Sequence, residues 1–269
     1  MYACINGATT MPYTLEQDLA AAEKAGFEGV EIWSRKLDTY LESHSVDGLK
    51  ELLDQHHLKV AALCPYSLIG FSDNRGSIIA IRNAAEIAKK INCPTLLVCG
   101  DAAPAGTDKE AAYDAMANIA CTYADWAEEH GVKIAIEPLG RHPLIPGPKE
   151  AMEILDRAEH ESLGLMMDTF HYYKSGVDLD AIRQIPVEIL LVVHVNDCEN
   201  RPLEELNDKH RVYMGEGVIP LKPILNLLKE KGYDGALSVE IFRDEYWAQP
   251  VDVISAASKS ALDRLMAGL

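Results

Sequence analysis

The sequence lacks the features that mark several large classes of protein. No stretch approaches ~18 uninterrupted apolar residues, so no transmembrane helix is predicted. Lysine and arginine together number 25 against 42 aspartate and glutamate, which gives a formal net charge of −17 with no basic stripe to offset it. Because such a surface repels phosphate backbones, we expect no nucleic-acid partner. The first residues contain no basic region followed by an apolar run, so no signal peptide is predicted.

Two further absences concern thiol and phosphate chemistry. The six cysteines are scattered, and none forms a C-x-x-C pair. Cys4, Cys64 and Cys99 lie in apolar, strand-like runs, where buried free thiols are common. These features predict a reduced, cytoplasmic protein. No glycine-rich phosphate loop of the form G-x-G-x-x-G or G-x-x-x-x-G-K-[ST] occurs at a predicted strand-to-helix turn, which argues against a nucleotide-binding fold.

The chain does contain a regular alternation of short apolar runs and helical patterns. In the first predicted helix, Thr14 is the expected N-cap, Gln17 completes a capping box, and Gly26 ends the helix. The predicted strands are residues 2–6, 29–33, 59–64, 95–100, 132–138, 163–168, 188–195 and 236–242. The predicted helices are residues 14–26, 45–57, 74–91, 108–130, 148–158, 179–184, 221–231 and 251–266.

Eight near-continuous apolar strands, each followed by a helix, predict a parallel sheet covered by helices. The expected fold class is α/β, as a single (β/α)₈ or TIM barrel domain over residues 1–269, since this barrel typically needs roughly 250 residues. No linker or low-complexity segment divides the chain. An open, doubly wound sheet is the alternative, and the missing phosphate loops weaken its nucleotide-binding versions.

Each of the last four predicted strands has a polar residue at or near its C-terminal end, after an apolar run. These residues are Glu137, Asp168, His194 and Glu240. Taken singly, each is compatible with a solvated or helix-capping side chain, but the C-terminal ends of barrel strands meet on one face. Three carboxylates converging there would raise one another's pKa unless a cation lay between them. The sequence therefore predicts one divalent metal ion, with Mn²⁺, Mg²⁺ or Co²⁺ suited to an oxygen-rich ligand set and Zn²⁺ also possible.

Other polar and aromatic residues follow the same strand ends, and substrate contact is the function expected of them. His171 lies three residues after Asp168, and Arg211 lies in the loop after the seventh strand. Arg141, after the fifth strand, and Trp33, at the end of the second, are further candidates, with Trp33 placed to cover the apolar face of a sugar. An ordinary loop residue is the alternative for each. Six more polar or aromatic residues lie at, near or after predicted strand ends and are further candidates of the same kind: Glu31, Phe71, His142, Asn196, Asp197 and Trp247.

The motifs around these residues resemble those of one enzyme family. IEP, MDTFH, HVND, R-x-x-x-G-E-G and SVEIFR occur in an order similar to that of the xylose-isomerase-like barrels, a family of sugar and polyol isomerases and epimerases. The resemblance spans nearly the whole chain and is greatest to the inosose isomerase branch. It implies that the four strand-end residues are metal ligands. It also implies that Glu137 and Glu240 form the acid/base pair, and that His171 and Arg211 contact substrate.

The expected activity is isomerisation or epimerisation of a small polyhydroxy ketone, an inosose or a ketose, through a metal-stabilised cis-enediolate. One glutamate would remove the proton next to the carbonyl and the other would return it. A dehydratase or lyase of the dehydroshikimate or inosose type, which uses the same enolate to expel a hydroxyl, is the alternative. The acidic charge disfavours an endonuclease of this fold, and the presence of both glutamates disfavours a non-catalytic sugar-binding barrel. The expected partner is a small molecule, with neither nucleic acid nor membrane; a homo-oligomer is compatible with the sequence.

Overall fold

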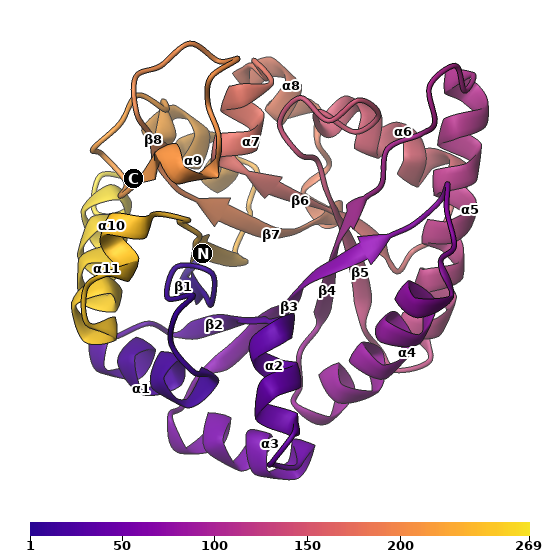
Figure 1. Ribbon diagram of the computed structural model, residues 1–269. Helices are drawn as coiled ribbons and strands as arrows, with labels where there is room; N and C mark the ends of the chain where they lie inside the picture. Colours follow the sequence, from indigo (N-terminus) through magenta and orange to yellow (C-terminus); the bar gives the residue numbers. More distant parts are fainter.

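Eight parallel strands close into a barrel in the computed structural model, which describes residues 1–269 (Figure 1). The barrel strands are β1 (Tyr2–Asn6), β2 (Gly29–Trp33), β3 (Lys59–Leu68), β4 (Thr95–Gly100), β5 (Lys133–Glu137), β6 (Leu163–Asp168), β7 (Leu190–Val195) and β10 (Ala236–Val239). They succeed one another around the barrel in chain order, and β10 pairs with β1 to close it. This closure confirms the predicted TIM barrel and excludes the open sheet.

Helices surround the barrel, as Figure 1 shows in the view along its axis. They are α1 (Leu15–Ala25), α2 (Ser34–Leu41), α3 (Val46–Gln55), α4 (Arg75–Lys90), α5 (Lys109–Glu128), α6 (Pro148–Ala158), α7 (Thr169–Lys174), α8 (Leu179–Gln184), α9 (Leu221–Glu230), α10 (Asp244–Trp247) and α11 (Val251–Met266). The predicted start of α1 is confirmed, because Thr14 and Gln17 form a capping box and Gly26 ends the helix at φ 86°. None of the helices combines the length and apolarity of a transmembrane span. All six cysteines are unpaired.

The structure also contains elements that the sequence did not indicate. α2, α7 and α10 span 8, 6 and 4 residues, too few turns for an apolar periodicity to stand out. β8 (Asp197–Cys198) and β9 (Arg211–Val212) form a two-residue antiparallel ribbon between β7 and α9. β3 continues past Pro65 to Leu68, with a shift in its pairing to β4 around the proline. β10 ends at Val239, so Glu240 follows the strand. The sequence had predicted that Glu240 lies within it.

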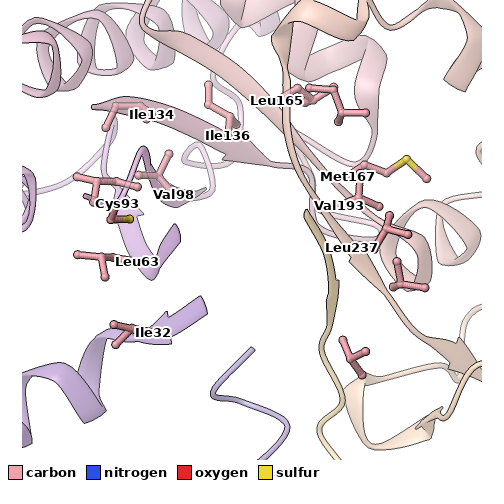
Figure 2. Close-up of a cluster of buried hydrophobic side chains, with 14 of the residues drawn as sticks. Ile32, Leu63, Cys93, Val98, Ile134, Ile136, Leu165, Met167, Val193 and Leu237 are labelled. Carbon is pink, nitrogen blue, oxygen red and sulfur yellow. The ribbon is translucent and has the colours of Figure 1, made fainter. Parts of the chain in front are cut away.

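Side chains on successive strand residues point alternately outward to the helices and inward to the barrel axis. The outward set belongs to the large hydrophobic core between barrel and helices, and several of its members, such as Ile134, Ile136 and Met167, are drawn in Figure 2. The inward set forms a smaller buried cluster of Ala62, Cys64, Leu97, Ala135, Met166 and Val192. This inner layer fills the part of the barrel formed by β3 to β7 beneath its C-terminal end.

Candidate metal centre

The two-residue period of the strands places three of the four predicted ligands directly above the inner apolar layer. In β5, Ala135 lies in that layer and Glu137 is the next inward residue. The same spacing relates Met166 to Asp168, Val192 to His194 and Ser238 to Glu240. The strand register adds to this, because Asp168 pairs with His194 across β6 and β7. In β10 it is Ser238 that pairs with His194, and Glu240 lies two residues further on. All four predicted ligands nevertheless come together at the C-terminal end of the barrel.

The four side chains offer ligand atoms that all lie within 4.8 Å of one another. His194 Nδ1 lies 3.1 Å from Glu240 Oε2, 3.5 Å from Asp168 Oδ2 and 4.0 Å from Glu137 Oε1. Although His194 Nδ1 is buried, it makes no hydrogen bond. A buried ring nitrogen without a partner, facing three carboxylates, is the donor arrangement that a divalent cation satisfies. The residues present thus fit the predicted ion.

Burial and mutual charge shift the pKa values of these groups in the metal-free protein. Burial, reinforced by the neighbouring carboxylates, raises the pKa of Glu137 to about 8 even though His194 opposes the rise. Burial would lower the pKa of His194, but the carboxylates of Glu240 and Glu31 outweigh it and hold that pKa well above its ordinary value. At pH 7, therefore, both Glu137 and His194 carry a proton until a cation displaces it.

Metal binding should accordingly release protons. Because Glu137 and His194 must both deprotonate to become ligands, and both have raised pKa values, we expect protons to leave when the ion binds at pH 7. The affinity should rise with pH at least until the pH passes the pKa of Glu137, about 8. Titration calorimetry in buffers of different ionisation enthalpy measures the released protons. A binding heat that is the same in every buffer would contradict this pKa assignment.

Asp168 is held in place by the helix that follows it. Its Oδ1 accepts hydrogen bonds from the backbone N–H groups of Phe170 (2.7 Å) and His171 (3.0 Å) at the start of α7. Its Oδ2 is directed at the other ligands and accepts from Asn196 Nδ2 at 3.2 Å. Despite burial, Arg211 and His171 keep the pKa of Asp168 well below its ordinary value. One oxygen is thus fixed by the backbone, while the other faces the remaining ligands and accepts hydrogen bonds from side chains, including Arg211.

Arg211 and His171, the predicted substrate contacts, are brought to the same place. The Arg211 guanidinium is fully buried and donates to Asp168 Oδ2 at 2.6 Å and to Glu240 Oε2 at 3.0 Å. Its other Nη lies 3.1 Å from His171 Nε2. Burial lowers the pKa of His171 to about 4, so this ring is neutral at pH 7. The pair forms a donor-rich wall beside the ligands.

Arg211 owes its position to β8, β9 and the loop behind them. It begins β9, where its Cα is paired with that of Cys198. The buried Asp197 carboxylate accepts from the backbone N–H groups of residues 215, 217 and 219 and so folds the loop after β9. A Cβ on Gly217 would lie 2.2 Å from the Cys198 carbonyl oxygen. The R-x-x-x-G-E-G motif therefore requires a glycine at position 217.

A cavity of about 320 Å³ opens above the ligands. Trp33 lines it, and the Trp33 ring lies edge-on to that of Phe242 with the ring centroids 5.8 Å apart. Arg141 is exposed in a turn at φ 65° and does not line the cavity, so the structure does not bring it together with the other candidates. Trp247 packs behind Phe242, with ring centroids 6.3 Å apart, and donates to the carbonyl of Ala8.

Several cavity residues were not singled out from the sequence. They are Phe242, Lys174, Cys99 and Asp208. The strand and helix periods could have indicated three of them. Cys99 is an inward residue at the end of β4, opposite Glu137, and its thiol donates to Glu137 Oε2 at 3.3 Å. Phe242 lies two residues after Glu240, and Lys174 lies one helical turn after His171.

Comparison with known proteins places this geometry among related barrels. The family described as xylose isomerase-like TIM barrel matches residues 19–264. An inosose isomerase of Halalkalibacterium halodurans is 33% identical over 92% of this chain and 90% of its own length. The crystal structure of the IolI protein, solved with a binding zinc atom, superimposes with a TM-score of 0.92 at 30% identity, covering 100% of this chain and 99% of IolI. A 3-dehydroshikimate dehydratase of Pseudomonas putida is 26% identical over 88% of this chain but only 37% of its own length.

Proposed function

Because this chain belongs to the xylose isomerase-like TIM barrel family, we propose that it isomerises or epimerises a small polyhydroxy ketone with the help of one divalent ion. Its similarity to inosose isomerases over nearly the whole chain supports the isomerase class. The observation that carries the proposal is the pair of carboxylates, Glu137 and Glu240, at one cavity beside a donor set that fits a cation.

Glu137, Asp168, His194 and Glu240 are the residues that would hold the ion. When bound, a divalent ion would supply Lewis-acid polarisation of the ketone oxygen, which acidifies the neighbouring C–H. The oxygen-rich donor set favours Mn²⁺, Mg²⁺ or Co²⁺. The zinc atom of IolI makes Zn²⁺ the natural fourth candidate to test.

Glu137 and Glu240 would move the proton. They come from strands on different sides of His194 in the barrel order, and both line the cavity. One carboxylate removes the proton next to the carbonyl, giving the enediolate, and the other returns it. Return to the same carbon is epimerisation, and return to its neighbour is isomerisation. The Arg211 guanidinium, within 3.0 Å of Glu240 Oε2, offers a fixed positive charge beside the developing oxyanion.

Arg211 and His171 are proposed to hold the substrate. His171→Ala should retain the metal but lower kcat/KM, because the neutral imidazole donates or accepts hydrogen bonds at the cavity without ligating. Arg211→Ala is expected to behave likewise. Metal content and kcat/KM, measured on the same preparations, separate the two roles. Loss of the ion would make these residues structural supports of the ligands and would contradict a substrate contact.

The substrate itself is proposed to be an uncharged polyhydroxy ketone, with an inosose as first choice. Glu137, Glu240 and Asp208 line the cavity, and the Arg211 cation is already paired with carboxylates. Lys174 is then the one other cationic side chain in the lining, against three carboxylates, which disfavours a phosphorylated sugar. The rings of Trp33 and Phe242 provide an apolar wall for a sugar or cyclitol face. The inosose isomerase relatives point to the same class of compound.

Deuterium exchange tests the activity and the substrate together. Metal-loaded protein is incubated in D₂O with 2-keto-myo-inositol, fructose, psicose, tagatose and their phosphates, and NMR follows deuterium incorporation next to the carbonyl. Exchange with the inosose alone supports the first choice. Exchange confined to a ketohexose would move the assignment to an epimerase. Exchange with a phosphorylated sugar alone would contradict the charge reasoning.

A dehydratase is the second candidate, supported by the similarity to a 3-dehydroshikimate dehydratase. The same proton abstraction followed by loss of a β-hydroxyl would give an unsaturated product and one water. Ultraviolet absorbance of a conjugated enone in the incubations above distinguishes this outcome from isomerisation, which creates no such chromophore.

A further inference from the structure

Glu31 is a buried carboxylate that the proposed chemistry does not use. It lies in the middle of β2, faces the barrel interior, and its side chain has no exposed surface. Its Oε2 accepts hydrogen bonds from Asn6 Nδ2 at 2.7 Å and from Ser238 Oγ at 2.9 Å. The same oxygen lies 2.7 Å from His194 Nε2. A fully buried carboxylate with polar partners from three other strands indicates a specific role for Glu31.

The partners of Glu31 determine which nitrogen of His194 carries a proton. The Asn6 amide is oriented by the backbone N–H of Ala8, which donates to Asn6 Oδ1 at 2.8 Å, so Nδ2 must be the atom that faces Glu31. Ser238 also donates to Glu31. Glu31 Oε2 is therefore an acceptor, and the third group at hydrogen-bond distance, His194 Nε2, is its donor. Asn6 Nδ2 also lies 3.4 Å from Nε2, but the 2.7 Å contact with Glu31 is much the shorter and determines the role of that nitrogen. The lone pair of the metal-free, neutral ring is then on Nδ1.

That lone pair lies on the ligand side of the ring. His194 Nδ1 is the atom that approaches Glu240, Asp168 and Glu137. It is also one of the buried side-chain atoms that have no hydrogen-bond partner. We infer that Glu31 is a positioning residue, which fixes the tautomer and orientation of His194 so that Nδ1 faces the cation. The inference rests on the metal site of the proposed function but on no particular substrate.

The contact between Glu31 and His194 also joins strands on both sides of the barrel closure. Asn6, Glu31, His194 and Ser238 come from β1, β2, β7 and β10. These strands include the pair at which the barrel closes, β1 with β10. This hydrogen-bonded cluster thus connects the strands that close the barrel with the side chain of His194, and so helps to orient that metal ligand. Outer partners of this kind typically contribute 10–100-fold in metal affinity.

Glu31→Gln tests the inference with little change in shape. The glutamine amide can donate to His194 Nε2, which would move the ring proton to Nδ1, the atom that must ligate. We expect Zn²⁺ and Mn²⁺ affinity, measured by competition with a chelator, to fall by ~10–100-fold. Because the effect acts through the metal, activity at saturating metal should return to within a few-fold of the parent, with a raised activation constant for the ion.

Asp18→Asn is the matched control. Asp18 is likewise a buried carboxylate, paired with Lys36 at 2.5 Å, but it contacts none of the four ligands. Its loss should leave metal affinity within about twofold of the parent, even if stability falls, because stability and ligand geometry are separate properties. Unchanged affinity in Glu31→Gln, or an equal loss in Asp18→Asn, would overturn the inference.

A second measurement needs no variant. In ¹⁵N-histidine NMR of the zinc-loaded parent protein, the His194 ring should show the metal on Nδ1 and a slowly exchanging proton on Nε2. Metal on Nε2 would overturn the inference even if Glu31→Gln failed to fold. Neither experiment uses turnover, so an absence of isomerase activity would leave this result standing and would count against the proposed function alone.

Discussion

Glu137→Gln and Glu240→Gln should each lower kcat by ~10²-fold or more, the usual scale for losing a general acid or base. Glutamine preserves the size of the side chain and an oxygen that can still approach a cation, but it has no carboxylate to accept a proton. The two residues line one cavity, and each lies within 4.0 Å of His194 Nδ1. Each is therefore placed to act on a substrate bound at the ligands.

The measurement has to separate proton transfer from metal loss, because both glutamates also belong to the donor set. Initial rates are therefore taken at saturating metal, with bound metal quantified in every preparation. Glu28→Gln makes the same chemical change at an exposed residue before β2, at the opposite end of the barrel, and should leave kcat unchanged. Parent-like kcat in both active-site variants would exclude the pair as acid and base.

Asp168→Ala and His194→Ala should lose the metal altogether at concentrations that saturate the parent. Each removes one of four donor groups, and each leaves buried partners uncompensated: Asp168 pairs with Arg211 at 2.6 Å, and His194 lies 2.7 Å from Glu31. The loss of affinity should exceed the ~10–100-fold typical of an outer partner. Elemental analysis of protein purified without chelator should find one ion per parent chain and almost none in the variants.

His160→Ala provides the control for this experiment. His160 follows α6 and contacts Asp125 on the helical layer, away from the barrel mouth. It should bind the ion as the parent does. If Asp168→Ala and His194→Ala also bound metal as tightly as the parent, the four-residue site would be misassigned, whatever activity the protein showed.

The barrel and the four ligand candidates were predictable because both depend on short-range periodicity. Alternation of strand and helix fixes the fold class, and a polar residue at the inward position that ends a strand stands out against apolar neighbours such as those before Glu137 and Asp168. Glu240 shows the limit of this reasoning, because its strand ends at Val239, three residues earlier than expected, and yet the side chain reaches the site.

The rest of the site depends on contacts between distant segments. Arg211 reaches Asp168 because β8 pairs with β9 and because Asp197 holds the loop that follows β9. No local sequence pattern predicts a ribbon of two residues per strand. Glu31 is 163 positions from His194 in the chain, so only the closed barrel brings them together. Arg141 follows a ligand strand but turns outward at φ 65°, a backbone conformation that its residue type does not indicate.

Anomalous diffraction from crystals grown with Mn²⁺ or Zn²⁺ tests the central claim most directly. The account predicts one strong peak per chain at the mouth of the barrel, with Glu137, Asp168, His194 Nδ1 and Glu240 as its protein ligands at ~2.0–2.3 Å. A peak bound by other residues, or none at metal concentrations that saturate activity, would contradict it.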